Sequence, residues 1–201
     1  GGVSVLMEIQ KDDVTQEELD STKQHLELRV NKLGVAETVI TTEGDKRIRV
    51  DIPGQFDSNE IVQSLSQSGN LVFKSPDGEE ILTGSDVKKA TAQLNQQTGK
   101  YEVGLEFNDE GTVKFAEATS KYIGQSIGIY LDDEEISNPT VQNAITDGKA
   151  SITGSSTLEE NKALAGMINS GALPVPVKSI SVKNVGAQLG ATAFPNAMKA
   201  G

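Results

Sequence analysis

The sequence contains no cysteine, so it can form neither a disulfide nor a thiolate metal site. Only 4% of its residues are aromatic, and a folded core must therefore be mainly aliphatic. No apolar run approaches the ~20 residues that a membrane-spanning helix requires. The chain still has 201 residues, of which 36% are hydrophobic. That is enough for one large or two small domains, at about 100–200 residues per domain.

Basic residues are also scarce, because 18 Lys and Arg residues stand against 29 Asp and Glu residues, which gives a net charge of −11. An acidic surface repels the phosphates of nucleic acids and of anionic lipids, so we expect no nucleic-acid binding. The sequence has no glycine-rich phosphate-binding loop, and we expect no cofactor. The chain begins Gly1-Gly2 without methionine and enters an alternating run at once, which indicates a piece of a longer protein.

The first third of the chain alternates between strand and helix patterns. In Arg47–Ile52, every second residue is apolar, as in a half-buried strand. Thr15 and Glu18 have the spacing of a capping box at a helix start, and Gly34 is a candidate helix end. The resulting order, strand–helix–strand–strand–helix–strand, is typical of a ferredoxin-like sandwich. We expect strands at 3–9, 39–40, 47–52 and 71–73, and helices that begin after Thr15 and Asp57.

The middle of the chain has a pattern of its own. Val87, Ala90 and Leu94 have helical spacing. The acidic run Asp132–Glu135 lies between two strand-like segments and predicts a hairpin tip. A last alternating segment near the C-terminus can return to the first sheet. We expect a helix over 85–94, helices after Asn108 and Thr157, and strands at 101–107, 127–131, 150–152 and 178–182.

These patterns predict an α+β protein in which a ferredoxin-like base sandwich carries an inserted α+β head subdomain. The base comprises residues 1–74 and 174–190, the head comprises 75–173, and a tail follows at 191–201. The chain returns to the base through Leu173-Pro-Val-Pro176. This segment is stiff, because each proline fixes its own φ and favours extended backbone in the preceding residue.

The two crossing points between base and head contain proline and glycine beside large apolar residues. Two interpretations stay open: ordinary loops within one rigid body, or a two-strut hinge on which the head swings. A hinge consists of a few residues at element ends that absorb changes in φ and ψ. The candidate hinge residues are Leu71, Phe73, Pro76, Leu173, Pro174 and Pro176.

Signals for an enzyme are weak. Gly124–Gly128 matches G-x-S-x-G with Ser126 at its centre, but a nucleophile elbow needs strand, turn and helix in that order, and the pattern here is the reverse. The only histidine, His25, lies within an expected helix and is interpreted as a helix-surface residue. The acidic run Asp132–Glu135 lacks the spacing of an EF-hand loop. We therefore predict neither an enzyme nor a metal site.

Two stretches are distinctive: Arg29-Val-Asn-Lys-Leu-Gly-Val-Ala-Glu37 and Arg47-Ile-Arg-Val-Asp-Ile-Pro-Gly54. Together with segments 103–119, 148–154, 170–176 and 185–190, in this order, they resemble the SecD family or the SecD half of a fused SecDF. Members of that family are membrane subunits that assist the Sec protein-export channel. The resemblance implies the same base and head, transmembrane helices on both sides of this chain, and an extracytoplasmic location at the cell membrane.

The resemblance also implies partners, namely the Sec translocon, a SecF-like half and unfolded preprotein. The energy would come from the proton-motive force through membrane helices outside this chain. We therefore expect the head to contact emerging preprotein and to aid late translocation by head–base movement. The alternative is a stand-alone extracellular ligand- or peptide-binding domain without a transport role. Candidate client-contact residues are Tyr101, Val103, Leu105, Phe107, Tyr122 and Ile129.

Overall fold

The computed structural model describes residues 1–31, 33, 37–154 and 157–185. The contacts divide the chain into two compact units. The first unit contains residues up to Gln67 and resumes at Pro174, and the second unit runs from Ser68 to Leu173. The expectation of an α+β protein is confirmed, because each unit combines helices with antiparallel sheet.

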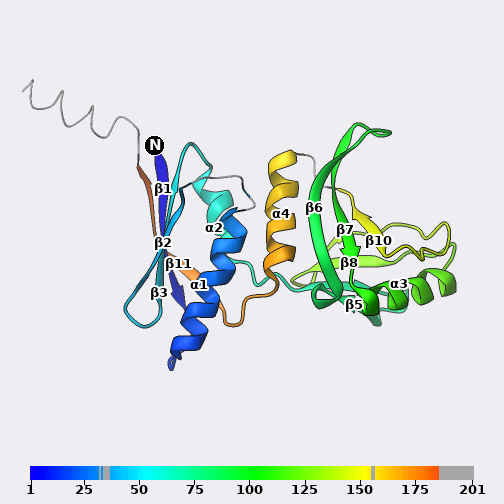
Figure 1. The fold of residues 1–201 in the computed structure, drawn as a ribbon, viewed down its shortest axis with the longest axis horizontal. Helices are drawn as coiled ribbons and strands as arrows, with labels where there is room; N and C mark the ends of the chain where they lie inside the picture. The colour runs from blue at the N-terminus through cyan, green and yellow to red at the C-terminus, as the bar shows by residue number, and fades with distance from the viewer. Residues whose placement is uncertain (32, 34–36, 155–156, 186–201) are drawn as a thin grey trace, which may run out of the picture. The chain divides into compact units, whose positions relative to one another are not determined.

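The first unit is a four-stranded sheet in the order β11-β1-β3-β2, with every neighbouring pair antiparallel. Its two helices lie on the same face of the sheet (Figure 1). The element order strand–helix–strand–strand–helix–strand is that of a ferredoxin-like unit, with the second unit inserted between α2 and β11. The elements are β1 (Gly2–Ile9), α1 (Gln16–Asn31), β2 (Val39–Glu43), β3 (Arg47–Pro53), α2 (Ser58–Ser66) and β11 (Val177–Val185).

The core of the first unit follows from the alternation in its strands. On β3, Ile48, Val50 and Ile52 are buried, whereas Arg47 and Arg49 lie on the opposite face. The helices begin where the sequence predicts. The N–H of Glu18 donates to Thr15 Oγ1 at 3.1 Å and the N–H of Thr15 donates to Glu18 Oε1 at 3.0 Å, which completes the predicted capping box. Gly34 lies outside the described residues.

The fourth strand of this sheet is not the one that the sequence order indicated. Residues 71–73 form a strand, but it pairs with β5 and β8 in the second unit. The edge of the first sheet is instead β11, more than a hundred residues further along the chain, which pairs with β1 from Gly2↔Val185 to Ile9↔Val177. The prediction that 178–182 returns to the first sheet is therefore confirmed.

The second unit contains two sheets, in the orders β5-β4-β8-β9 and β10-β7-β6. Helix α4 packs against β6 and β7, and α3 packs against β5 and β7; Figure 1 shows α4 running beside β6. The elements are β4 (Leu71–Lys74), β5 (Glu80–Thr83), the 3-10 turn η1 (Gly84–Asp86), β6 (Val87–Asn95), β7 (Lys100–Phe107), α3 (Asp109–Lys121), β8 (Gly128–Leu131), β9 (Glu134–Ser137), β10 (Lys149–Ile152) and α4 (Leu158–Ser170).

Three phenylalanines form the centre of the core of the second unit. The rings of Phe73, Phe107 and Phe115 lie 5.0–5.9 Å apart between centroids, two pairs of them edge to face. Aromatic pairs in this geometry contribute about 0.5–1.5 kcal/mol each beyond the burial of their area. Three of the five phenylalanines of the chain thus meet in one core.

The predicted helix over 85–94 is wrong, because this segment is β6, which pairs with β7 along its whole length. Its helical spacing was accidental. Of the three residues that carried it, only Ala90 is buried, while Leu94 is 47% exposed. The other predictions for this unit agree with the structure. Asn108 accepts from the N–H of Gly111 at 2.8 Å, and Thr157 accepts from the N–H of Glu160 at 3.1 Å.

Candidate functional site

The chain crosses the border between the two units twice. The chain passes from the first unit to the second between Gln67 and Ser68, and it returns between Leu173 and Pro174. Both junctions lie at the ends of helices, because α2 ends at Ser66 and α4 ends at Ser170. The base was expected to extend to residue 74, and the contacts divide the chain seven residues earlier, since β4 belongs to the second unit.

Buried Arg29 holds the end of α2 in the first unit. Its side chain comes from α1, is 2% exposed and donates from Nη1 to the carbonyl oxygens of Ser64, at 3.0 Å, and Gln67. The last carbonyl groups of a helix have no partner within the helix, and a cation is favourable at this end. Arg29 therefore fixes the last residue of the first unit before the chain leaves it.

The return segment is held at both of its ends. Within the second unit, the N–H of Leu173 donates to the carbonyl oxygen of Ser68 at 2.8 Å. Within the first unit, the N–H of Gln10 donates to the carbonyl oxygen of Pro176 at 2.8 Å, immediately before β11 begins. The span between these two anchored points contains only Pro174 and Val175.

The predicted hinge residues fall into two groups. Leu173, Pro174 and Pro176 lie at the return junction. By contrast, Leu71 and Phe73 are 2% and 1% exposed in the core of the second unit. Pro76, the remaining one, is exposed in the turn between β4 and β5. These last three lie inside the second unit and not at its border, because the strand that contains two of them is paired on both sides.

Most of the predicted client-contact residues are buried. Val103, Leu105, Phe107 and Ile129 are at most 4% exposed and belong to the core of the second unit. They offer no surface to a client in this structure. The alternation of apolar and polar residues correctly predicted strands, but the apolar residues lie on the faces of these strands that point into the core. Tyr101 and Tyr122, the other two candidates, are half-buried.

Exposed apolar side chains of the second unit occur elsewhere. The large ones are Leu94 at 47%, Val113 at 57% and Ile123 at 53%. Leu94 lies directly opposite Tyr101 in the register of the β6–β7 hairpin, so the two project from the same face near the hairpin tip. Ile123 directly follows Tyr122 after the end of α3. The sequence pattern did not single out Leu94 because it was assigned to a helix.

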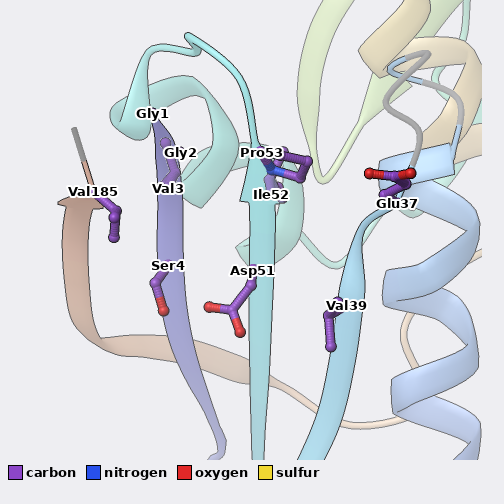
Figure 2. Close-up of a pocket in the computed structure, with 10 residues that line it drawn as sticks. All are labelled: Gly1, Gly2, Val3, Ser4, Glu37, Val39, Asp51, Ile52, Pro53 and Val185. Atoms are coloured by element: carbon purple, nitrogen blue, oxygen red, sulfur yellow. The ribbon is translucent and has the colours of Figure 1, made fainter. Parts of the chain in front are cut away.

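A hollow of about 440 Å³ lies at one end of the sheet of the first unit, on the face opposite the helices. Figure 2 shows Ser4 and Asp51 projecting from neighbouring strands, with Val39 and Glu37 at the side. The hollow is shallow and open to solvent. Further along this face, a hydrogen bond from Arg49 lowers the pKa of Glu43.

The two residues that carried the weak catalytic signals belong to different units. Ser126 belongs to the second unit, where it forms an isolated bridge with Thr140 after a turn and before a strand. His25 belongs to the first unit, and its Nδ1 lies 2.7 Å from the carbonyl oxygen of Ser21 on the same helix. Within the described ranges, no three His, Asp or Glu side chains are placed to hold a metal ion.

One buried carboxylate has neutral partners only. Glu102 on β7 is 6% exposed and accepts from Asn95 Nδ2 at 2.9 Å and Gln93 Nε2 at 3.0 Å. Burial raises the pKa of Glu102, but hydrogen bonds from Asn95, Gln93 and Ser151 outweigh it, and the pKa lies below its ordinary value. Glu102 is therefore ionised at neutral pH. Its hydrogen bonds link β7 to side chains of the two neighbouring strands, β6 and β10.

Comparison with known proteins defines the class. Residues 49–175 match the family profile "SecDF, P1 head subdomain", and residues 19–78 match "Protein translocase subunit SecDF, P1 domain, N-terminal". The sequence is 38% identical to the protein translocase subunit SecD of Sebaldella termitidis, over 95% of this chain, and 37% identical to that of Dictyoglomus turgidum, over all of it. These matches place the chain among protein translocase subunits. It belongs to the SecD/SecDF family.

Solved structures agree with this assignment. A structure of SecDF, a membrane component that enhances protein export, superposes on 90% of this chain with a TM-score of 0.70 and 30% identity, and all of that chain is covered. A crystal structure of SecDF in a super-membrane-facing form gives a TM-score of 0.74 at 31% identity, with 30% of that chain covered. The chain spans about half the length of the SecD relatives named above. Among the described residues, no helix has the length and apolar character needed to cross a membrane.

Proposed function

We propose that this chain is the extracytoplasmic domain of a SecD-like accessory subunit of the Sec translocon. In this role it contacts unfolded preprotein and aids late translocation by movement of the second unit relative to the first. The observation that carries the proposal, beyond family membership, is the division into two units joined by only two junctions. Its partners are the translocon, a SecF-like half and the preprotein, and membrane helices outside this chain anchor it.

The mechanism is mechanical. The proton-motive force supplies the energy through residues outside this chain, at ~2.3 kcal/mol per charge moved across 100 mV. A client must be released after each movement, so its contacts have to be weak. Ordering one client residue costs about 1–2 kcal/mol of backbone entropy, which favours a shallow apolar surface over a deep pocket. Exposed Leu94 with half-buried Tyr101 opposite it, and exposed Ile123 beside half-buried Tyr122, provide such a surface on the second unit.

The hinge in this proposal consists of the two junctions. Leu173, Pro174 and Pro176 are its residues on the return path, and Gln67 and Ser68 are its residues on the outward path. Both paths are short, so they restrict the second unit to rotation without separation from the first. The alternative hypothesis, a stand-alone ligand- or peptide-binding domain, needs a closed pocket with convergent polar groups, and the open hollow of the first unit does not favour it.

Site-specific photocrosslinking during export tests the client contact. A photoreactive amino acid is placed at Leu94 or Ile123 in the full-length protein, and a secretory preprotein is trapped midway through translocation. We expect crosslinks from both positions. Thr41, exposed on β2 of the first unit, is the matched control and should give fewer. Absence of crosslinks from both Leu94 and Ile123 while export proceeds would contradict the proposal.

A further inference from the structure

The tip of the β8–β9 hairpin is tied to the first residues of the second unit by Asp132. Its carboxylate accepts from the N–H of Gly69 at 3.0 Å and from the N–H of Asn70 at 2.9 Å. The N–H of Asp132 donates in return to the carbonyl oxygen of Asn70 at 2.9 Å. These bonds join residues 62 and 63 positions apart in the sequence. The backbone directly after the outward junction is therefore anchored.

The backbone conformations of Asp132 and Gly69 favour these hydrogen bonds. Asp132 and Asp133 have φ of 50° and 68°, so together they form the two-residue turn that a tight hairpin requires, in which Asp is one of the favoured residues. Gly69 has φ of 88°, a conformation that other residues adopt only with strain. The N–H groups of Gly69 and Asn70 therefore both point at the carboxylate of Asp132. Successive backbone N–H groups in this arrangement favour the binding of an anion.

The return junction is anchored to the same place. Leu173 donates its N–H to the carbonyl oxygen of Ser68, the residue directly before Gly69. The two paths of the chain thus meet at one root, which we define as Ser68, Gly69, Asn70 and Leu173. The root is held to the sheet of the second unit by Asp132 on one side and by the pairing of β4 with β8 on the other.

We propose that Asp132 is a positioning residue that keeps this root rigid, so that bending between the units is confined to the backbone joining Gln67 to Ser68 and Leu173 to Val175. This inference rests on the proposed movement of the second unit. It moves the pivot away from Leu71, Phe73 and Pro76, which lie on the anchored side of Asp132. A force applied to the second unit is then transmitted to the junctions through the rigid root. It is not dissipated by local separation of β4 from its sheet.

The test compares D132A and D132N with the matched variant D133A in the full-length protein. Asp133 occupies the next turn position, is exposed, and its carboxylate has no hydrogen-bond partner among the residues described here. This chain has no cysteine, so T41C and Q96C allow one spin label in each unit once any cysteine elsewhere has been replaced. Distances between the labels are measured by pulsed electron spin resonance, and amide exchange by mass spectrometry.

We expect D132A to broaden the distance distribution between the labels and to speed amide exchange at 69–70 by about tenfold, as for the loss of a charged hydrogen-bond acceptor. D133A should change neither, and D132N should lie between. Exchange in the core strand β7 should stay slow, which shows that the second unit remains folded. If D132A unfolds the unit, D132N carries the comparison.

An unchanged distance distribution in D132A or in a folded D132N would overturn the positioning role. Faster exchange at 69–70 without broadening would overturn it too, because the bond would then be only a local turn contact. Neither result depends on client binding. Failure of the crosslinks from Leu94 and Ile123 would contradict the proposed function and leave the distance measurement interpretable, so the two failures are distinguishable.

Discussion

At the scale of single residues, Arg29 is the charged side chain with the largest structural task in the first unit. It lies within the apolar stripe of α1, between buried Leu26 and Val30, and satisfies carbonyl groups at the end of α2. An arginine at a position with the spacing of the core is a signal that sequence reasoning could have used. Its burial indicates a partner, because arginine is rarely buried unless it is paired.

R29M should destabilise the first unit by about 2–4 kcal/mol, because two partly buried carbonyl groups at the end of α2 lose a charged donor. The free energy of unfolding is measured by urea denaturation, with amide exchange on β1 to assign the transition to the first unit. K23M on the same helix is the control, since the Lys23 side chain is 35% exposed and its pair with Glu27 spans 3.9 Å. Equal effects of the two substitutions would contradict this role of Arg29.

Glu102 predicts a pH dependence. Its pKa in the folded state is lowered, so the ionised form stabilises the fold at pH values above the unfolded-state pKa, near 4.3. This contribution is lost as the pH falls through the lower, folded-state pKa. E102Q should therefore be less stable than the wild type at pH 7, and the difference should shrink on acidification to pH 3. Thermal unfolding across this range measures it.

The control for Glu102 is E106Q on the same strand and the same face. Glu106 is exposed and pairs loosely with Lys88 at 3.7 Å. Its substitution should leave the shape of the stability–pH curve nearly unchanged. A difference between E102Q and wild type that stays constant from pH 7 to pH 3 would mean that the hydrogen bonds to Glu102 do not favour its ionised form.

At the scale of elements, a side chain of α4 forms hydrogen bonds with the edge of β6 in place of a neighbouring strand. Asn169 on α4 donates from Nδ2 to the carbonyl oxygen of Ala90 and accepts from its N–H through Oδ1, both at 2.8 Å. A side-chain amide thus takes the place of a neighbouring peptide group. Unpaired strand edges invite association with other chains, and covering them is one way in which proteins prevent it.

N169A should leave the N–H and C=O of Ala90 without this partner and destabilise the second unit by about 1–3 kcal/mol. Amide exchange at Ala90 should accelerate more than exchange at Val103 on β7. N169D is an informative companion, because it retains the acceptor and loses the donor. N143A, in an exposed loop, is the control. Unaltered exchange at Ala90 in N169A would show that α4 is held to β6 by packing alone.

The elements differ in how far the sequence predicted them. Helix starts were found correctly at Thr15, Asp57, Asn108 and Thr157, because each cap forms within three residues of the helix it begins. β6 was predicted as a helix, because Val87, Ala90 and Leu94 fit a helical period. Its pairing with β7, from Asn95↔Lys100 to Val87↔Phe107, decides the conformation, and a periodicity count within β6 alone does not include these partners.

At the scale of the whole molecule, the insertion of one unit into another explains why two junctions exist. A chain that leaves a sheet and returns to complete it must cross the border twice, and β11 completes the sheet that β1 and β3 begin. Two crossings limit the freedom of the inserted unit more than one flexible linker would. Under the proposed function, rotation is the main relative motion that these crossings leave to it.

A disulfide engineered between the two units should impair export when oxidised and restore it on reduction. The chain has no cysteine of its own, so each bond formed within it is the engineered one. Pairs are selected by a crosslinking screen, and export of a secretory preprotein is followed in vesicles with and without reductant. Each single-cysteine variant is the control. Unchanged export with the lock formed would exclude head movement as a requirement.

The sequence by itself determined the class, the caps and most strands, because each of these depends on neighbours in the chain or on motifs that can be read in order. Only the tertiary structure decided that residues 71–74 belong to the sheet of the second unit, which alternating residues face inward, and which backbone groups Asp132 and Arg29 bind. These features join residues tens of positions apart or more, and their energies arise only when distant segments pack together.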